Sequence, residues 1–94
     1  MEILRKIADK GGEFYILKDG KRVAEMTFIF AGESLIIADH TWVSDTEKGL
    51  GLGKKLFDEL VKYVRENSFK MMATCPYVLH EIKKNREQLL DILK

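Results

Sequence analysis

Apolar and polar residues alternate along the first half of the chain, as they do in strands that bury one face. Residues 14–18 are rich in strand-forming side chains, and residues 23–30 show two distinct faces. The Asp19-Gly20 pair between these runs predicts a tight hairpin turn, because such turns need positive φ at their central residues. A turn at residues 31–34 precedes a third run, from Leu35 to about Val43. The pattern predicts an antiparallel meander of three strands.

The spacing of apolar residues changes in the second half of the chain. From Leu52 onwards, apolar positions recur with the period of an amphipathic helix, which we expect to end near Asn67-Ser68. Residues 71–75 are almost continuously apolar, which suits a short strand covered on both faces. Pro76 is typical of a helix start and predicts a helix over residues 77–85, and a final helix is expected over residues 87–93.

The predicted order is β-β-β-α-β-α, and the predicted fold class is α+β. Because a crossover helix joins parallel strands, we expect the last strand to lie parallel to the third. Gly11-Gly12 is expected to form a turn. Large apolar side chains are expected in the core rather than in an aromatic nucleotide-binding surface, and these are Phe14, Phe28, Phe30, Trp42, Phe57, Met71 and Met72.

Length and composition indicate a single folded domain over residues 1–94. Hydrophobic residues make up 46% of the chain and charged residues 33%, a balance that argues against disorder. One cysteine excludes an internal disulfide and a cysteine-rich metal site, and no metal is expected. The N-terminus lacks a signal-like apolar segment, and no apolar run is long enough to span a membrane, so a cytoplasmic protein without a membrane partner is expected.

The charge of the chain is nearly balanced but unevenly distributed. A formal net charge of +1 gives no indication of a nucleic-acid partner. Residues 1–47 carry six Lys and Arg against nine Asp and Glu, whereas residues 48–94 carry ten against six. An anionic ligand is therefore expected to bind to the second half.

A glycine-rich segment, Lys48 to Gly53, lies between the third strand and the long helix. The first N–H groups of a helix have no intrahelical acceptor and lie at the positive end of its dipole, so they form a site for phosphate. Glycines let the backbone approach a bulky anion. A glycine-rich turn that binds nothing is the alternative.

Two familiar phosphate-binding motifs fit this segment poorly. A P-loop requires Ser or Thr after its Gly-Lys pair, and here Gly53-Lys54 is followed by Lys55. A dinucleotide fingerprint starting at Gly49 would place its third glycine at Lys54, and an antiparallel meander precedes it.

The segment resembles the pyrophosphate loop of the GNAT superfamily of acetyl-CoA-dependent acyltransferases, with Lys48, Gly51 and Gly53 at the motif positions. The likeness is greatest to small stand-alone GNAT-like proteins, because Asp39-His40-Thr41 precedes the loop and Cys75-Pro76-Tyr77-Val78 follows the next strand. Lys48 replaces the usual Arg or Gln and loses its planar donor array. The chain is also much shorter than an ordinary GNAT domain, so the resemblance implies that the N-terminal helices and last strand pair of larger relatives would be missing.

The resemblance implies a minimal GNAT-like fold that binds acetyl-CoA or CoA. Its pantetheine arm would bond to backbone groups of Thr41, Trp42 and Val43 like an added strand. Its pyrophosphate would lie at Lys48 and at the N–H groups of Gly49, Leu50, Gly51, Leu52, Gly53 and Lys54. Tyr77 would lie near the cofactor, as the acid that protonates the leaving thiolate or as a packing residue.

Acyl transfer needs a base for the acceptor, and either an acid for the leaving thiolate or a nucleophile that takes the acyl group first. We predict His40 as the base and Cys75 as the nucleophile or acid, facing one cleft if their strands are neighbours. A buried apolar role for Cys75 and a hydrogen-bonded surface role for His40 are the alternatives.

The predicted function is transfer of acetyl from acetyl-CoA to an amine or thiol on an unidentified small-molecule or protein acceptor. The alternative is a non-catalytic module that binds CoA or acyl-CoA, or a protein-interaction domain with the same fold. Either a monomer or a homodimer is compatible with the sequence.

Overall fold

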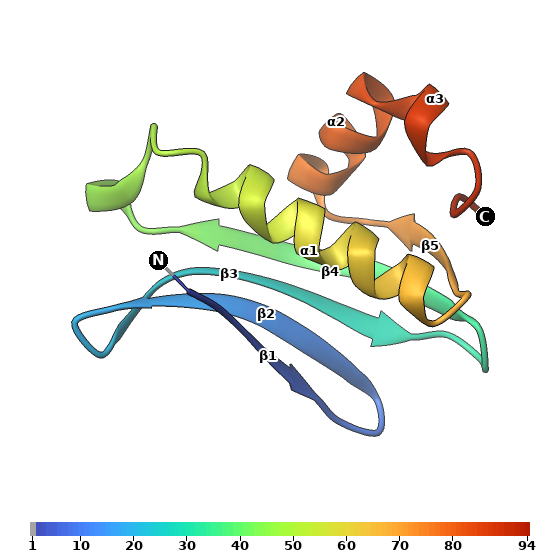
Figure 1. Cartoon of the computed structure of the whole chain (residues 1–94), viewed down its shortest axis with the longest axis horizontal. Coiled ribbons are helices and arrows are strands. Elements are labelled where there is room, and N and C mark those ends of the chain that lie inside the picture. The colour runs from blue at the N-terminus through green and yellow to red at the C-terminus, as the bar shows by residue number, and fades with distance from the viewer. Residues whose placement is uncertain (1) are drawn as a thin grey trace.

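A computed structural model describes residues 2–94 as a five-stranded sheet with helices packed on it (Figure 1). The elements in chain order are β1 (Ile3–Ile7), β2 (Gly11–Lys18), β3 (Lys21–Phe30), β4 (Leu35–Val43), a 3-10 helix (Asp45–Glu47), α1 (Leu52–Glu66), β5 (Lys70–Ala73), α2 (Pro76–Lys84) and α3 (Arg86–Leu89).

The strands lie in the order β1-β2-β3-β4-β5, so neighbours in sequence are neighbours in space. The first four strands are antiparallel, whereas β5 pairs with β4 in parallel through the crossover helix α1. This confirms the α+β prediction of an antiparallel meander, a crossover helix, a parallel strand and C-terminal helices.

Strand β1 was not predicted from the sequence, and the prediction of a turn at Gly11-Gly12 was wrong. Strand β1 pairs with β2 from Ile3 opposite Ile16 to Ile7 opposite Gly12, and both glycines are strand residues of β2. The turn lies before them, where the Ala8 N–H donates to the Gly11 carbonyl over 2.8 Å. Glycine is needed because a Cβ at position 11 would lie 2.2 Å from the Phe28 carbonyl oxygen.

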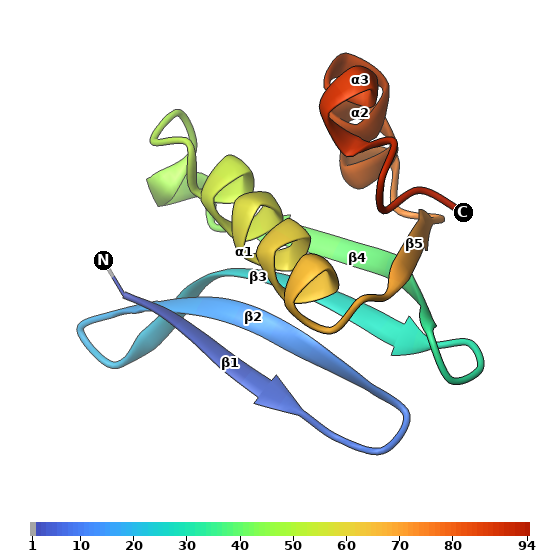
Figure 2. The ribbon, with the colours of Figure 1, turned by 45° about the vertical axis from the view of Figure 1, so that its right-hand side comes forward.

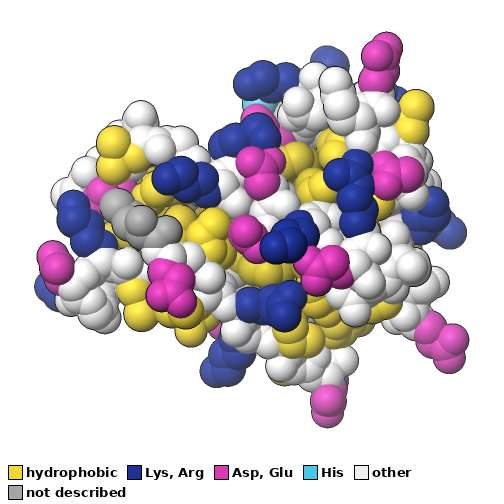
Figure 3. Space-filling model, viewed as in Figure 1, with side chains coloured by type: hydrophobic (Ala, Val, Ile, Leu, Met, Phe, Trp, Pro, Cys, Tyr) yellow, Lys and Arg dark blue, Asp and Glu magenta, His cyan; other side chains and the backbone are white. Residues whose placement is uncertain are grey.

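Helix α1 covers one face of the sheet, as Figures 1 and 2 both show. Its apolar stripe packs against the large apolar side chains on the facing side of β2, β3 and β4. The buried residues of this layer include Phe14, Ile16, Met26, Phe28, Ile36, Leu56, Phe57, Leu60 and Val64. The exposed side of α1 carries charges of both signs, which are interspersed over the surface in Figure 3.

A β-bulge in β4 determines which side chains face the core. Thr27 pairs with His40 but Phe28 pairs with Ala38, so Asp39 is an extra residue in β4. Ala38 is buried under α1, and beyond the bulge Thr41 takes that side. The core prediction for Trp42 was therefore wrong, because the bulge turns this side chain to the opposite face, where it is 43% exposed.

We call that opposite side of the sheet the open face. In contrast to the face covered by α1, it carries polar and aromatic side chains that are half-buried or exposed. They include Tyr15, Glu25, Thr27, Asp39, His40 and Trp42. Met72 is also exposed, contrary to the core prediction, because it alternates with the buried Met71 along β5.

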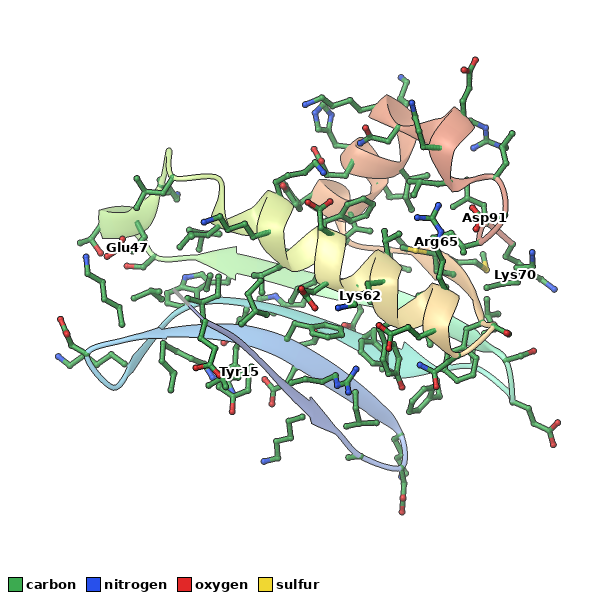
Figure 4. The ribbon with its side chains drawn as sticks, in the orientation of Figure 1. Tyr15, Glu47, Lys62, Arg65, Lys70 and Asp91 are labelled. Atoms are coloured by element: carbon green, nitrogen blue, oxygen red, sulfur yellow. The ribbon has the colours of Figure 1, made fainter. Side chains whose placement is uncertain are left out.

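The C-terminal segment returns to the sheet instead of forming the predicted helix over residues 87–93. Helix α3 ends at Leu89, and the Met71 N–H donates to the Ile92 carbonyl over 2.7 Å. Arg65 on α1 holds this segment by donating to both carboxylate oxygens of Asp91, and both residues are labelled in Figure 4. This ion pair lowers the pKa of the Asp91 carboxyl.

None of the helices within residues 2–94 combines the length and the apolar character that crossing a bilayer requires.

The docking of α1 predicts a large cost for truncating its central leucine. Leu56 is fully buried, so Leu56→Ala should lower the free energy of unfolding by about 2–5 kcal/mol, through lost burial and a residual cavity. Urea denaturation measures this change. Leu90→Ala removes the same atoms from an exposed position and should have little effect. Equal effects of the two substitutions would contradict the packing described.

Candidate functional site

The two parallel strands diverge at one point in the sheet. Pairing between β4 and β5 runs from Leu35 opposite Lys70 to Ala38 opposite Ala73 and then stops. The Ala38 carbonyl accepts bonds from the N–H groups of both Thr74 (2.9 Å) and Cys75 (3.2 Å), where the chain leaves the sheet to begin α2. Residues 39–43 of β4 therefore extend beyond the last partner that β5 provides.

Alternation along β4 places particular backbone groups on this free edge. The Ser44 N–H donates to the Val23 carbonyl on β3 over 2.8 Å. Since backbone groups alternate in direction along a strand, those of Trp42 also face β3, whereas those of Thr41 and Val43 face the free edge. This edge is available to an extended ligand that pairs as a strand would.

The glycine loop lies next to this edge and leads into α1. Gly49 and Gly51 have φ values of 86° and 73°, in the region that favours glycine. Gly51 is the N-cap of α1 and provides no side-chain cap, and the Lys55 N–H makes a helical bond to its carbonyl over 3.1 Å. The N–H groups of Leu52, Gly53 and Lys54 precede that bond, so they have no acceptor within the helix.

Ion pairs hold the segment before the glycine loop in place. The buried Glu47 carboxylate, labelled in Figure 4, accepts a bond from Lys18 Nζ at the end of β2 over 2.9 Å. Lys48 pairs with Asp45 over 2.9 Å and lowers the pKa of that carboxyl. Lys54 pairs with Asp58 one turn along α1. These ion pairs join side chains only, so none of them occupies a backbone N–H group of the loop.

Cys75 lies where the two strands diverge. It is the N-cap of α2, it is only 4% exposed, and its Sγ donates to Thr41 Oγ1 over 3.3 Å. Because the bulge turns Thr41 toward the core side of β4, the thiol lies on that side as well.

His40 lies on the open face, with its ring Nε2 3.0 Å from Glu25 Oε2. The His40 side chain and the Cys75 thiol therefore lie on opposite sides of β4, and each has its own partner. The sequence-based expectation that both face one cleft depended on the two strands being neighbours; β4 and β5 are neighbours, but the bulge places His40 on the open face.

Tyr77, in the first turn of α2, packs against the start of α1. A Cβ built on Gly53 would lie 2.9 Å from the Tyr77 ring, so glycine is required for this contact. Burial raises the pKa of the Tyr77 hydroxyl, and the negative charges of Glu81 and Asp58 raise it further. The phenol consequently keeps its proton at neutral pH.

Sequence reasoning missed three carboxylates near these residues. Glu25 and Glu47 are the partners of His40 and Lys18 described above. Glu81 follows Tyr77 by one helical turn, is 4% exposed, and has one oxygen without a partner among the described residues. The i, i+4 spacing from Tyr77 was the available signal, since such residues share a helix face.

Comparison with known proteins agrees with this geometry. The fold, with its divergent strand pair beside a glycine-rich helix start, is of the GCN5-related N-acetyltransferase type. A family model described as GCN5-related N-acetyl-transferase matches residues 13–92. The chain belongs to this family.

Individual relatives cover the chain to different extents. The NMR structure of a GCN5-like protein from Staphylococcus aureus is 35% identical, covers 99% of this chain and 87% of its own, and has a TM-score of 0.75. Human protein NATD1 is 29% identical over 62 residues, which are 66% of this chain and a little over half (55%) of NATD1. The aminoglycoside N-acetyltransferase AAC(6')-Iy in complex with CoA shares the fold, with 14% identity, coverage of 85% and 67%, and a TM-score of 0.61.

The surroundings of Tyr77 predict that its hydroxyl titrates later than an exposed tyrosine. In an alkaline titration followed by the ultraviolet absorbance of tyrosinate, Tyr77→Phe should remove the late part of the transition, because burial and nearby carboxylates disfavour the phenolate. Loss of the early part instead would show that Tyr77 is not shielded as described.

Proposed function

We propose that this protein binds acetyl-CoA and transfers its acetyl group to an amine or thiol acceptor. The observation that carries the proposal is the free edge of β4 directly beside the uncapped N-terminus of α1. Together they provide a strand edge that an extended ligand can pair with and a site for an anion, on a chain of the GCN5-related family. The Asp-His-Thr, Lys-x-x-Gly-x-Gly and Cys-Pro-Tyr segments all border this region.

The residues present suit the chemical parts of CoA. The N–H groups of Leu52, Gly53 and Lys54 would bind the pyrophosphate, with the helix dipole and the charges of Lys48 and Lys54 adding attraction. The backbone groups of Thr41 and Val43 would pair with the amides of the pantetheine arm. The complex of AAC(6')-Iy with CoA supports the proposal, because that protein shares the fold.

Three side chains would carry the proton and acyl transfers. The bound cofactor supplies an acetyl thioester. In direct transfer, His40 would accept the proton that the acceptor loses as its nitrogen or sulfur bonds to the acetyl carbon. The carbon–sulfur bond breaks, and Tyr77 would donate its proton to the departing thiolate. In the two-step alternative, the Cys75 sulfur would accept the acetyl group before the acceptor does.

A binding function without turnover is the second candidate, and the state of Cys75 favours it. A buried thiol that donates to Thr41 is a small packed residue more than an activated nucleophile. The protein would then bind CoA or acyl-CoA at the same edge.

CoA binding predicts a gain in thermal stability that depends on the glycine loop. Free CoA at 100 times its dissociation constant should add about 2.7 kcal/mol. Gly51→Ala should weaken binding about tenfold or more, because a Cβ in the left-handed region strains the loop and blocks the anion. Thermal shift assays measure both.

Gly20→Ala provides the matched control, since Gly20 has a similar φ of 79° in the hairpin far from the loop. Each substitution should cost about 1 kcal/mol of stability. Only the loop variant should show a smaller response to CoA, about half of the wild-type gain or less at the same CoA concentration. An equal response in both variants, or none in the wild type, would contradict the proposed site.

Incubation with acetyl-CoA distinguishes the routes. The two-step route predicts a gain of one acetyl group in the intact mass that is sensitive to hydroxylamine, as a thioester is, and absent from Cys75→Ala. Direct transfer predicts release of CoA with an amine and no adduct. CoA binding with neither result would leave the binding function as the better account.

A further inference from the structure

We infer that Glu25 is a positioning residue that fixes the tautomer of His40, and that the pair accepts the acceptor's proton on the open face. The inference rests on the proposed function, because it assigns a proton acceptor to that reaction. It identifies the atom involved, the residue that orients it, and the face of the sheet from which the acceptor approaches.

The hydrogen bond between the two residues determines which nitrogen is free. His40 Nε2 lies 3.0 Å from Glu25 Oε2, and both side chains lie on the open face. An ionised carboxylate only accepts hydrogen bonds, so Nε2 must carry the hydrogen. In the neutral ring the lone pair is then on Nδ1, which is the nitrogen that can take a proton.

Glu25 is itself held by a network that crosses three strands. Its other oxygen, Oε1, accepts a bond from Arg22 Nη1 over 3.3 Å, and the same nitrogen donates to Glu13 on β2. The Arg22 guanidinium lies 4.0 Å from the ring centroid of Tyr15, which is labelled in Figure 4. Each Glu25 oxygen therefore has a separate partner, which limits rotation of the carboxylate away from His40.

The bulge places this pair beside the proposed cofactor edge. Asp39, the extra residue, is fixed on the open face by a 2.6 Å bond from Thr27 Oγ1. His40 follows it and immediately precedes Thr41, whose backbone lies on the free edge. The His40 side chain is half exposed, so an acceptor can reach it from solvent.

The proton transfer is balanced within the proposed reaction. The acceptor's nitrogen forms its bond to the acetyl carbon, and its N–H bond breaks with the proton passing to Nδ1 of His40. The carbon–sulfur bond breaks and the sulfur keeps the electron pair. Glu25 neither gains nor loses a proton in this step, and its carboxylate stabilises the imidazolium that forms.

The tautomer provides a test that does not depend on activity. Long-range ¹H–¹⁵N NMR of the full chain, at a pH where His40 is neutral, should show hydrogen on Nε2 in the wild type and a mixture of tautomers in Glu25→Ala. Glu33→Gln is the matched control, since it changes an exposed glutamate in the turn before β4, outside this network, and should leave the tautomer unchanged. Hydrogen on Nδ1 in the wild type, or no change in Glu25→Ala, would overturn the inference.

Kinetics with acetyl-CoA and lysine amide test the functional part. Glu25→Gln should lower kcat about tenfold or more and leave the KM for acetyl-CoA unchanged. This loss is part of the roughly 10²–10⁴-fold rate gain that a positioned proton-transfer group supplies. Glu25→Asp should restore part of the loss, and the control Glu33→Gln should stay within about twofold of wild type. If the wild type turns over and Glu25→Gln has the same kcat, this inference is overturned but the proposed function is not. A wild type that neither binds CoA nor releases its thiol overturns the proposed function, and the NMR result then decides the pairing of Glu25 with His40.

Discussion

The structure depends on one event in the sheet, the end of pairing between β4 and β5 after Ala38 and Ala73. Parallel strands that stay paired leave no edge for a ligand between them. Here one carbonyl, that of Ala38, accepts the N–H groups of two successive residues, and the chain turns out of the sheet into α2. The remaining residues of β4 keep their backbone hydrogen bonds to β3 on one side. This part of the strand therefore stays ordered while its other edge has no neighbouring strand. The glycine loop and the start of α1 follow directly along the chain.

The bulge at Asp39 determines on which side of the sheet the side chains near this edge lie. Thr41 lies on the core side, where it contacts Cys75, whereas His40 and Trp42 lie on the open face. A reaction at the edge would then have thiol and phenol groups on the side of the helices and an imidazole on the other. This separation suits a cofactor and an acceptor that approach from opposite faces.

The sequence predicted the parts of the fold that rest on local patterns. Periodicity located α1, and the Asp19-Gly20 pair located the hairpin, whose turn residues do have positive φ. The glycine loop was located by composition and by its place between a strand and a helix. Strand β1 was missed because its residues alternate weakly, and Gly11 and Gly12 were read as a turn although contact with Phe28 requires them. The sequence contains no pattern that predicts the bulge, because Asp39 and His40 fit the pattern of an ordinary strand. The environments of Trp42 and His40 and the role of Glu25 depend on it, so they required the structure.

The central claim is that CoA adds to the free edge of β4, and amide hydrogen exchange with and without CoA tests it most directly. Bound CoA should slow exchange at Thr41 and Val43, whose N–H groups face the edge, and leave Trp42, whose backbone faces β3, unchanged. Exchange at Thr41 and Val43 that stays the same in a protein saturated with CoA would show that the ligand binds elsewhere and would contradict the account.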